Sequence, residues 1–286
     1  VEIIDWTPFF QTWELAGRYP AILEDPLVGE AASGLFLDAQ RMLRRIVEEK
    51  WLRAAAVIGL YPAATDVDDV VLYADPERTV ELERLLFLRQ QKAKAEDSPN
   101  LCLADFVAPH SAGLKDHIGL FAVTAGLGIA SRVRQFESDN DDYSAILLKA
   151  LADRLAEALA EHMHLRVRKE FWGYASGESL ENEGIINEGY QGIRPAPGYP
   201  ACPEHSEKDK IFRLLGATES ADMTLTSSYA MLPAASVCGY YFAHPEAKYF
   251  VLGPVLPDQL EDYAGRKGCA SEDLRRLLPA NLPDLV

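Results

Sequence analysis

The chain has 286 residues, of which 44 are Asp or Glu and 28 are Lys or Arg, so its formal net charge is −16. With 48% hydrophobic and 25% charged residues, the composition is that of a globular protein and excludes a disordered or fibrous chain. The acidity argues against a nucleic-acid partner, because phosphate contacts need a cationic face. Apolar stretches such as 120–125 are far too short for a membrane span. We therefore expect a cytoplasmic protein that contacts neither nucleic acid nor membrane.

The four cysteines show none of the spacings of metal or redox sites. They are Cys102, Cys202, Cys238 and Cys269, with no CxxC pair among them. We expect four reduced thiols, the usual state in a cytosolic protein. The chain begins at Val1 and not at Met, from which we expect that its natural start has been removed.

Apolar patterning predicts alternating helices and strands over the first 125 residues. Apolar positions three or four apart are typical of an amphipathic helix, and short continuous apolar runs bounded by turn residues are typical of strands. The predicted elements are a helix over 26–50, strands over 54–60 and 69–75, a helix over 79–94, and strands over 101–108 and 118–125.

The strongest pattern lies at 144–171, where apolar residues recur every three or four positions and predict one buried stripe on a long helix. Glu157 lies about 180° round the helix from this stripe, with Asp153 and His164 near it. We expect Asp153 and His164 on the surface. Glu157 has two interpretations, a solvated side chain or a ligand contact.

The composition and patterning of the sequence change after this helix. Residues 173–205 contain six Gly and four Pro without any periodic pattern, which indicates a long functional loop. A helix is predicted from Ser206 to Gly216. The chain shows no repeats and no linker, so we expect one domain over 1–286. The remaining predictions are strands over 237–242 and 249–255 forming a hairpin, and helices that begin at Pro257 and Ser271.

Common catalytic and metal-binding motifs are absent from the sequence. Gly126 and Gly128 begin a possible nucleotide loop, but the third position of GxGxxG is Ser131. His162 and His164 lie two apart on a predicted helix and point to different faces, so we expect no metal site there. Neither a GxSxG elbow nor a P-loop occurs.

The segment 187–205 is the most informative part of the loop. Four prolines between 195 and 203 hold its backbone extended and leave carbonyl and N–H groups free to face a ligand. Arg194 stands at its start, where a planar guanidinium can bind a carboxylate through two hydrogen bonds. Gly198 allows close approach and Tyr199 offers a ring face. The alternative is a proline-rich surface loop with an incidental arginine.

This segment resembles the S-adenosylmethionine-binding activation domain of cobalamin-dependent methionine synthase, whose hallmark is an R-x-x-x-G-Y-P-A-C-P stretch. The resemblance spans nearly the whole chain. It continues at 4–10 (IDWTPFF), 105–109 (DFVAP), 166–173 (RVRKEFWG), 249–250 (YF) and 262–264 (DYA). It implies an α+β fold, a C-shaped single domain with a central, largely antiparallel sheet flanked by helices.

The resemblance also implies a set of ligand contacts. Arg194 matches the family's carboxylate-binding arginine, and Asp5 matches a contact suited to the ligand's ammonium. Backbone groups of the stretch that includes Ala196, Gly198 and Tyr199 match those that hold the adenine.

Further matches concern aromatic and acidic residues. Tyr249 matches an aromatic beside the ligand, where a ring can attract the sulfonium, and Phe250 adjoins it. Glu188 and Glu157 match acidic residues near the ligand. His205 matches a histidine that reaches the cobalamin-binding module, although a surface position beside a helix start is an equal alternative.

By resemblance, the function is repair of methionine synthase. The domain binds S-adenosylmethionine as the methyl donor that, with an electron from a flavodoxin-type protein, converts oxidised cob(II)alamin to methylcobalamin. The chain lacks the family's D-x-H-x-x-G cobalamin motif. Cobalamin and zinc are therefore expected on other modules, as is methyl transfer to homocysteine. Because the chemistry takes place at cobalt, we expect positioning and no acid–base dyad here.

Alternatives and one tension remain at this point. The chain could be an S-adenosylmethionine-binding module or a free-standing methyltransferase not tied to cobalamin, or a scaffold that has lost the ligand. It could be an excised domain or a separate subunit. An acidic flavodoxin would be repelled by this net charge unless a basic patch exists. Candidates for that patch, each with a structural alternative, are Arg166, Arg168 and Lys169, or Arg266 and Lys267.

Overall fold

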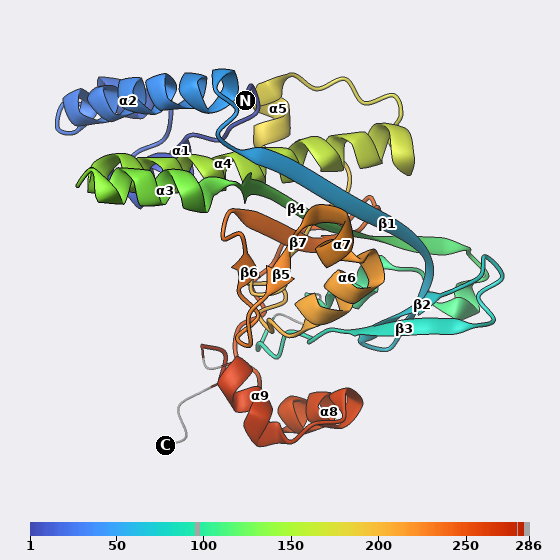
Figure 1. The fold of residues 1–286 in the computed structure, drawn as a ribbon. Helices are drawn as coiled ribbons and strands as arrows, with labels where there is room; N and C mark the ends of the chain where they lie inside the picture. The colour runs from blue at the N-terminus through green and yellow to red at the C-terminus, as the bar shows by residue number, and fades with distance from the viewer. Residues whose placement is uncertain (95–97, 279, 283–286) are drawn as a thin grey trace.

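A five-stranded antiparallel sheet runs through the centre of the molecule (Figure 1). The structure is a computed structural model that describes residues 1–94, 98–278 and 280–282. The strand order is β3-β2-β1-β4-β7, and every neighbouring pair is antiparallel. The strands are β1 (Arg53–Asp66), β2 (Asp69–Tyr73), β3 (Glu81–Leu86), β4 (Asp116–Leu127) and β7 (Ser236–Tyr241), and a separate hairpin pairs β5 (Thr224–Leu225) with β6 (Met231–Leu232).

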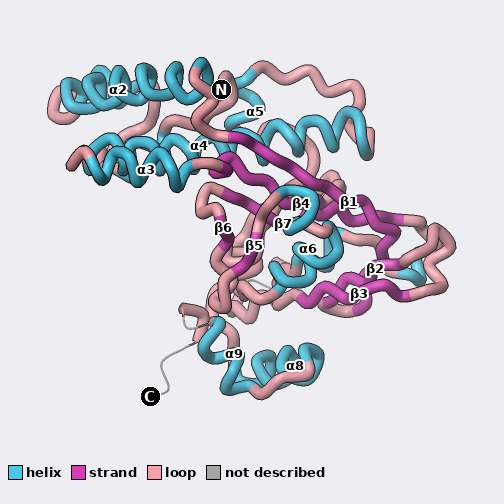
Figure 2. Tube along the Cα trace, in the orientation of Figure 1, coloured by secondary structure: helices cyan, strands magenta, loops and turns pink. Residues whose placement is uncertain are grey.

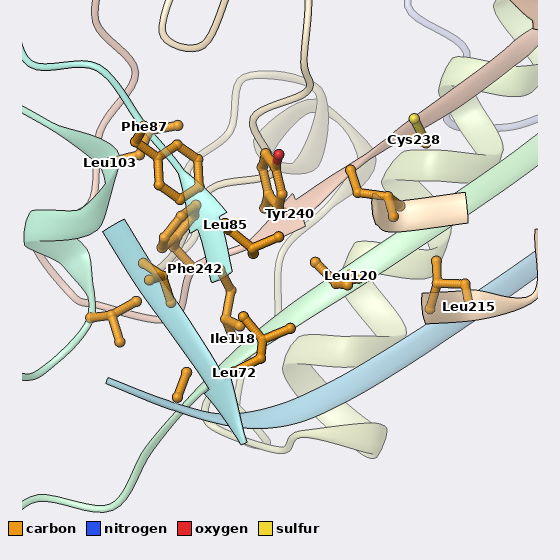
Figure 3. Packing of buried hydrophobic residues seen from close by; sticks show 14 of the residues in the cluster. Leu72, Leu85, Phe87, Leu103, Ile118, Leu120, Leu215, Cys238, Tyr240 and Phe242 are labelled. Atoms are coloured by element: carbon orange, nitrogen blue, oxygen red, sulfur yellow. The ribbon is translucent and has the colours of Figure 1, made fainter. Parts of the chain in front are cut away.

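The central strand β4 is buried on both faces, which explains its continuous apolar sequence. Alternate residues of a strand point to opposite faces. Leu120 and Ala122 lie in one core cluster, whereas Phe121 and Val123 lie in another. Figure 3 shows the first of these clusters, in which Leu120 lies near Tyr240. The sheet therefore separates two hydrophobic cores.

Long helices cover one face of the sheet (Figures 1 and 2). On α4, Ala152, Ala156 and Ala160 recur every four residues, are fully buried, and pack in the cluster that contains Phe121. Their small side chains let α4 lie close to the sheet. The helices in this part are α1 (Thr7–Thr12), α2 (Gly29–Glu48), α3 (Ile129–Ser138) and α4 (Asp142–Arg166), which continues into a π-helical turn, Val167–Phe171.

Shorter helices cover the opposite face and the end of the molecule. Helices α6 (Glu207–Leu215) and α7 (Ala217–Ala221) pack in the core cluster of Figure 3. Helices α8 (Pro257–Lys267) and α9 (Ser271–Leu277) lie at the far end from α2 and α4, so the outline is C-shaped (Figure 1). The other short elements are α5 (Asn182–Ile186) and 3-10 turns at Ala21–Glu24, Leu103–Phe106 and His110–Ala112.

The predicted fold class is confirmed, as are most of the predicted elements. Helices α2, α4, α6, α8 and α9 and strands β1, β2, β4 and β7 fall where patterning places them. The antiparallel sheet excludes the nucleotide-fold methyltransferase, which needs parallel strands joined by helices. All four cysteines are free. Within the described residues, no helix has the length and apolarity needed to cross a membrane.

The helix predicted over 79–94 is wrong. Its first half is strand β3, and Leu85 pairs with Val70 of β2. The Asp75 carboxylate accepts hydrogen bonds from the backbone N–H groups of Thr79, at 3.1 Å, and Val80, at 2.8 Å. These bonds close a turn that returns the chain antiparallel to β2, and the free edge of β2 then outweighs the local helical spacing.

The strand predicted over 101–108 is also wrong. Residues Leu103–Phe106 form a 3-10 turn, because the Asp105 carboxylate accepts a hydrogen bond from the Cys102 N–H at 2.8 Å. Arg89 holds the same carboxylate through both of its terminal nitrogens, at 2.9 and 2.7 Å. A short-range side-chain cap here replaces the extended backbone.

The strand predicted over 249–255 does not form. The turn at His244 is present, but the free edge of β7 pairs with Ile193, which exchanges two hydrogen bonds of 3.0 Å with Phe242. Residues 249–255 instead contact the long loop, where the Leu252 N–H donates to the Pro200 carbonyl at 2.8 Å. The loop therefore occupies the position that the hairpin prediction assigned to this segment.

Candidate functional site

A groove of about 530 Å³ lies where α4, strands β4 and β7 and the long loop meet. Seven of the nine predicted ligand contacts line it, although the sequence spreads them over 94 positions, from 157 to 250. The lining residues are Phe121, Glu157, Glu188, Arg194, Pro195, Ala196, Tyr199, Pro200, Ala201, Val237, Tyr249, Phe250 and Val251.

Phe121 and Val237 contribute the sheet side of the groove, and residues 194–201 lie against the sheet edge. The Tyr240 N–H donates to the Pro195 carbonyl at 2.9 Å. This approach requires Gly239, because a Cβ there would lie 2.4 Å from the Pro195 oxygen. The loop is thus joined to the rigid sheet, which gives the groove a fixed wall.

The predicted extended segment contains a tight turn at Gly198. The Gly198 N–H donates to the Cys202 carbonyl at 2.8 Å, and the Tyr199 N–H donates to the Ala196 carbonyl at 3.1 Å. Gly198 has φ +98°, and a Cβ at this position would lie 2.3 Å from Cε1 of His205. Glycine is therefore required for both backbone conformation and space.

Arg194 is held by groups on several sides. Its Nη1 lies 2.6 Å from Oε2 of Glu161 and also donates to the Tyr190 hydroxyl, while Nη2 lies 3.8 Å from Oε1 of Glu188. Its backbone N–H donates to the Tyr249 hydroxyl at 3.0 Å. Burial lowers the pKa of Arg194, but Glu161, together with Tyr190, Tyr249 and Glu188, outweighs burial and the net pKa is raised. Arg194 therefore keeps its charge although it is largely buried.

Glu161 belongs to a buried network behind Arg194. The Tyr190 hydroxyl donates to Oε2 of Glu161 at 3.0 Å, and the Arg168 guanidinium lies 3.6 Å from the centre of the Tyr190 ring. Arg168 is fully buried and donates two hydrogen bonds to Glu178, at 2.8 and 2.9 Å. Burial raises the pKa of Glu161, a rise opposed by the charges of Arg194 and Arg168.

His164 is fully buried, so its predicted surface position is wrong. Its ring stacks on Tyr241, with centroids 5.0 Å apart, and its Nε2 lies 3.2 Å from the Tyr174 hydroxyl. Tyr174 and Tyr190 come from the loop, which covers a face of α4 that would otherwise be exposed. Burial, with the charges of Arg194 and Arg168, lowers the pKa of His164 well below 6.5. Asp153 is exposed, as predicted.

Of the other predicted contacts, Glu157 lines the groove and Asp5 does not. The Tyr199 hydroxyl donates to Oε1 of Glu157 at 3.3 Å across the opening. Asp5 is not among the lining residues, and its carboxylate accepts a hydrogen bond from the Thr7 N–H at 2.9 Å. His205 is half-buried beneath Gly198.

His205 also has a cationic neighbour. The Lys208 ammonium donates to its Nδ1 at 2.9 Å. Burial and this charge lower the pKa of His205. Its ring is therefore neutral at pH 7 and can offer Nε2 as a donor.

Most of the cations proposed as a basic patch form ion pairs within the molecule. Arg166, Arg168, Arg266 and Lys267 each form ion pairs, whereas Lys169 is exposed. Their partners are Glu170, Glu178, Glu161, Asp69, Asp262, Glu204 and Glu207. Arg168, Arg266 and Lys267 each pair with at least one buried carboxylate, which supports their structural interpretation, whereas the pair of Arg166 with Glu170 is exposed and does not test it.

Sequence reasoning missed Glu161 and Tyr190, and it named Arg168 only as a candidate for the basic patch. Glu157, Glu161, His164 and Arg168 are spaced four, three and four residues apart, so they share one helical face. Ionisable side chains at this spacing identify the face. Because this face lies opposite the apolar stripe of the same helix, the pattern indicates a solvated face.

The groove has the features of a binding site for a small ligand that carries charges of both signs, because a fixed guanidinium, two carboxylates and tyrosine rings converge on it. Residues 1–268 match the family described as the vitamin B12-dependent methionine synthase activation domain. The chain therefore belongs to this family. Its structure is similar to the crystal structure of the MetH reactivation domain bound to AdoHcy, with a TM-score of 0.94 and 53% identity over 98% of this chain and 86% of that one.

The Gly198 turn supplies a stability test. We expect Gly198→Ala to lower the free energy of unfolding by at least about 2 kcal/mol, because it adds both backbone strain and a clash with His205. Gly113→Ala is the matched control, since Gly113 also has a positive φ but no atom within 4 Å of its Cβ position, so its expected loss is about 1 kcal/mol. Urea denaturation measures both, and equal losses would contradict the packing of His205 beneath the turn.

The buried His164 predicts a pH dependence of stability. In the unfolded chain this ring gains a proton near pH 6.5, but the folded protein keeps it neutral, so stability falls as pH drops below about 6.5. His164→Phe keeps a ring on Tyr241 and removes the titration. The difference between the free energy of unfolding of the parent and that of this variant should therefore fall by about 1.4 kcal/mol when the pH is lowered from 7.5 to 5.5.

The matched control for this test is His162→Phe, two residues along the same helix where the ring is exposed. It should keep the pH dependence of the parent, as measured by denaturation at each pH. If His164→Phe shows the same pH dependence as the parent, the account of a buried neutral ring fails.

Proposed function

We propose that the groove binds S-adenosylmethionine and presents its methyl group for the reductive conversion of cob(II)alamin to methylcobalamin. The observation that carries this proposal is Arg194, a largely buried residue that lines the groove and whose guanidinium is held at Nη1 by Glu161. The solved relative binds AdoHcy, the molecule that S-adenosylmethionine becomes when it loses this methyl. Belonging to the activation-domain family supports the same role.

The charges of the groove match those of the ligand. The ligand's carboxylate suits Arg194, whose planar nitrogens can donate two hydrogen bonds. Its ammonium and sulfonium are cations, and Glu157 and Glu188 are the carboxylates of the groove. We assign Asp5 to the ammonium as a further contact, although it is not among the lining residues. A groove of about 530 Å³ lies within the usual range for a ligand of this size.

The aromatic residues and the loop suit the remaining parts of the ligand. Tyr249 and Phe250 line the groove, and a ring face beside a sulfonium contributes about 1 kcal/mol. Backbone groups of Ala196, Gly198 and Tyr199 would hold the adenine, and the turn leaves the Ala196 N–H and the Gly198 carbonyl for this purpose. The Tyr249 hydroxyl accepts a hydrogen bond from the Arg194 N–H, so Tyr249 links the aromatic part of the groove to the arginine assigned to the carboxylate.

The domain's contribution to reactivation is positioning. When bound, S-adenosylmethionine supplies an electrophilic methyl group, and the reacting cobalt belongs to the cobalamin-binding module. This chain holds the methyl donor in a fixed orientation, which lowers the entropic part of the barrier. His205, near the groove and able to donate from Nε2, would contact that module. A flavodoxin-type protein would supply the electron, and methyl transfer to homocysteine would occur on other modules.

We also propose that residues 1–286 form one activation module, whether it functions as part of a longer synthase or as a separate subunit. The two hydrophobic cores share strand β4, and the groove takes residues from both halves of the chain.

Titration calorimetry with S-adenosylmethionine tests the proposal. We expect one-to-one binding by the parent chain and a loss of about 1.5–3 kcal/mol in Arg194→Ala, because the ligand's carboxylate loses a charged partner. Arg132→Ala is the control, since Arg132 lies on α3 over Trp51 and away from the groove. Absence of binding by the parent, or equal affinity of Arg194→Ala and the parent, would contradict the proposal.

A further inference from the structure

A buried polar network outside the groove is unexplained by the ligand. Glu161, Arg168 and Glu178 have side chains 7%, 0% and 8% exposed, and none of them lines the groove. Burying three charges costs free energy even when they are paired. Oε1 of Glu161 and Nη1 of Arg168 have no hydrogen-bond partner among the described residues and lie 3.8 Å apart. Such an arrangement requires an explanation beyond packing.

The network reaches the groove at one atom, Nη1 of Arg194. Oε2 of Glu161 contacts Nη1 of Arg194 at 2.6 Å, and the Tyr190 hydroxyl bonds both residues. These contacts use Nη1, whereas Nη2 lies 3.8 Å from Oε1 of Glu188, a residue that lines the groove. The guanidinium is thereby held by two residues, Glu161 and Tyr190, that do not line the groove.

Tyr190 is itself held from two directions. The Arg168 guanidinium covers its ring at 3.6 Å, and the edge of the His164 ring meets it with centroids 5.1 Å apart. Arg168 is in turn fixed by its two hydrogen bonds to Glu178. Each of these side chains is held by its neighbours, and together they fix the orientation of the Arg194 guanidinium.

We propose that Glu161, assisted by Tyr190, is a positioning residue that orients Arg194 so that the ligand's carboxylate binds on the Nη2 side of the guanidinium. The inference rests on the proposed binding of S-adenosylmethionine. It assigns to Glu161 a role in recognition of the amino-acid end of the ligand and none in recognition of the adenosine end.

Two ligands distinguish this role from a structural one. S-adenosylmethionine carries the carboxylate, whereas decarboxylated S-adenosylmethionine keeps the ammonium, sulfonium and adenosine. We expect Glu161→Gln to weaken binding of S-adenosylmethionine by about tenfold and that of the decarboxylated compound by less than about twofold. Tyr190→Phe, which removes only a hydroxyl, should shift the ratio of the two affinities in the same direction by a smaller factor. It keeps the test valid if Glu161→Gln does not fold.

Asp69→Asn is the matched control. It weakens a buried ion pair with Arg266 that involves neither the Arg168 network nor Arg194, so it should lower stability and leave the ratio of the two affinities unchanged. Calorimetry with both ligands on each folded variant gives this ratio. If Glu161→Gln and Tyr190→Phe weaken both ligands equally or weaken neither, the positioning role is overturned.

The same data separate the two proposals. Failure of the parent chain to bind S-adenosylmethionine would overturn the proposed function. In another outcome, the parent binds S-adenosylmethionine more tightly than the decarboxylated compound while the variants show the same ratio of affinities. That result would overturn the role of Glu161 and leave the proposed function standing.

Discussion

The site depends on the buried ion pair between Glu161 and Arg194. Removing two charges from water costs free energy, which their attraction offsets only when the geometry is good and the remaining polar atoms are bonded. Here α4 contributes the carboxylate and the loop contributes the guanidinium and Tyr190. The pair therefore joins the helix to the loop, and it places a permanent cation in a groove that also contains the carboxylates of Glu157 and Glu188.

The edge of β7 provides the second constraint. Ile193 pairs with Phe242, and the Pro195 carbonyl accepts from Tyr240, so the start of the binding loop behaves as an additional strand. A loop fixed to a sheet pays little ordering entropy when a ligand binds. This arrangement explains how a segment with irregular backbone can still form a precise binding surface.

The sequence predicts the parts of this structure that depend on local spacing. Long helices, buried strands and the proline-braced loop with Arg194 follow from periodicity and composition. The predictions fail where a non-local contact outweighs the pattern, as at 79–94, where Asp75 closes a turn and β2 supplies a free edge. Glu161 is missed for the same reason, because Tyr190 and Arg194, which contact it, lie 29 and 33 residues away along the chain.

A crystal structure of the chain with S-adenosylmethionine tests the central claim most directly. The account predicts the ligand's carboxylate within hydrogen-bond distance of Nη2 of Arg194, with Nη1 still bonded to Glu161. A ligand bound elsewhere would contradict it, for example in the apolar cavity of about 570 Å³ between the N-terminal residues, α2 and α4. A carboxylate that displaces Glu161 from Arg194 would also contradict the account, because the acid would then compete with the ligand and would not orient its partner.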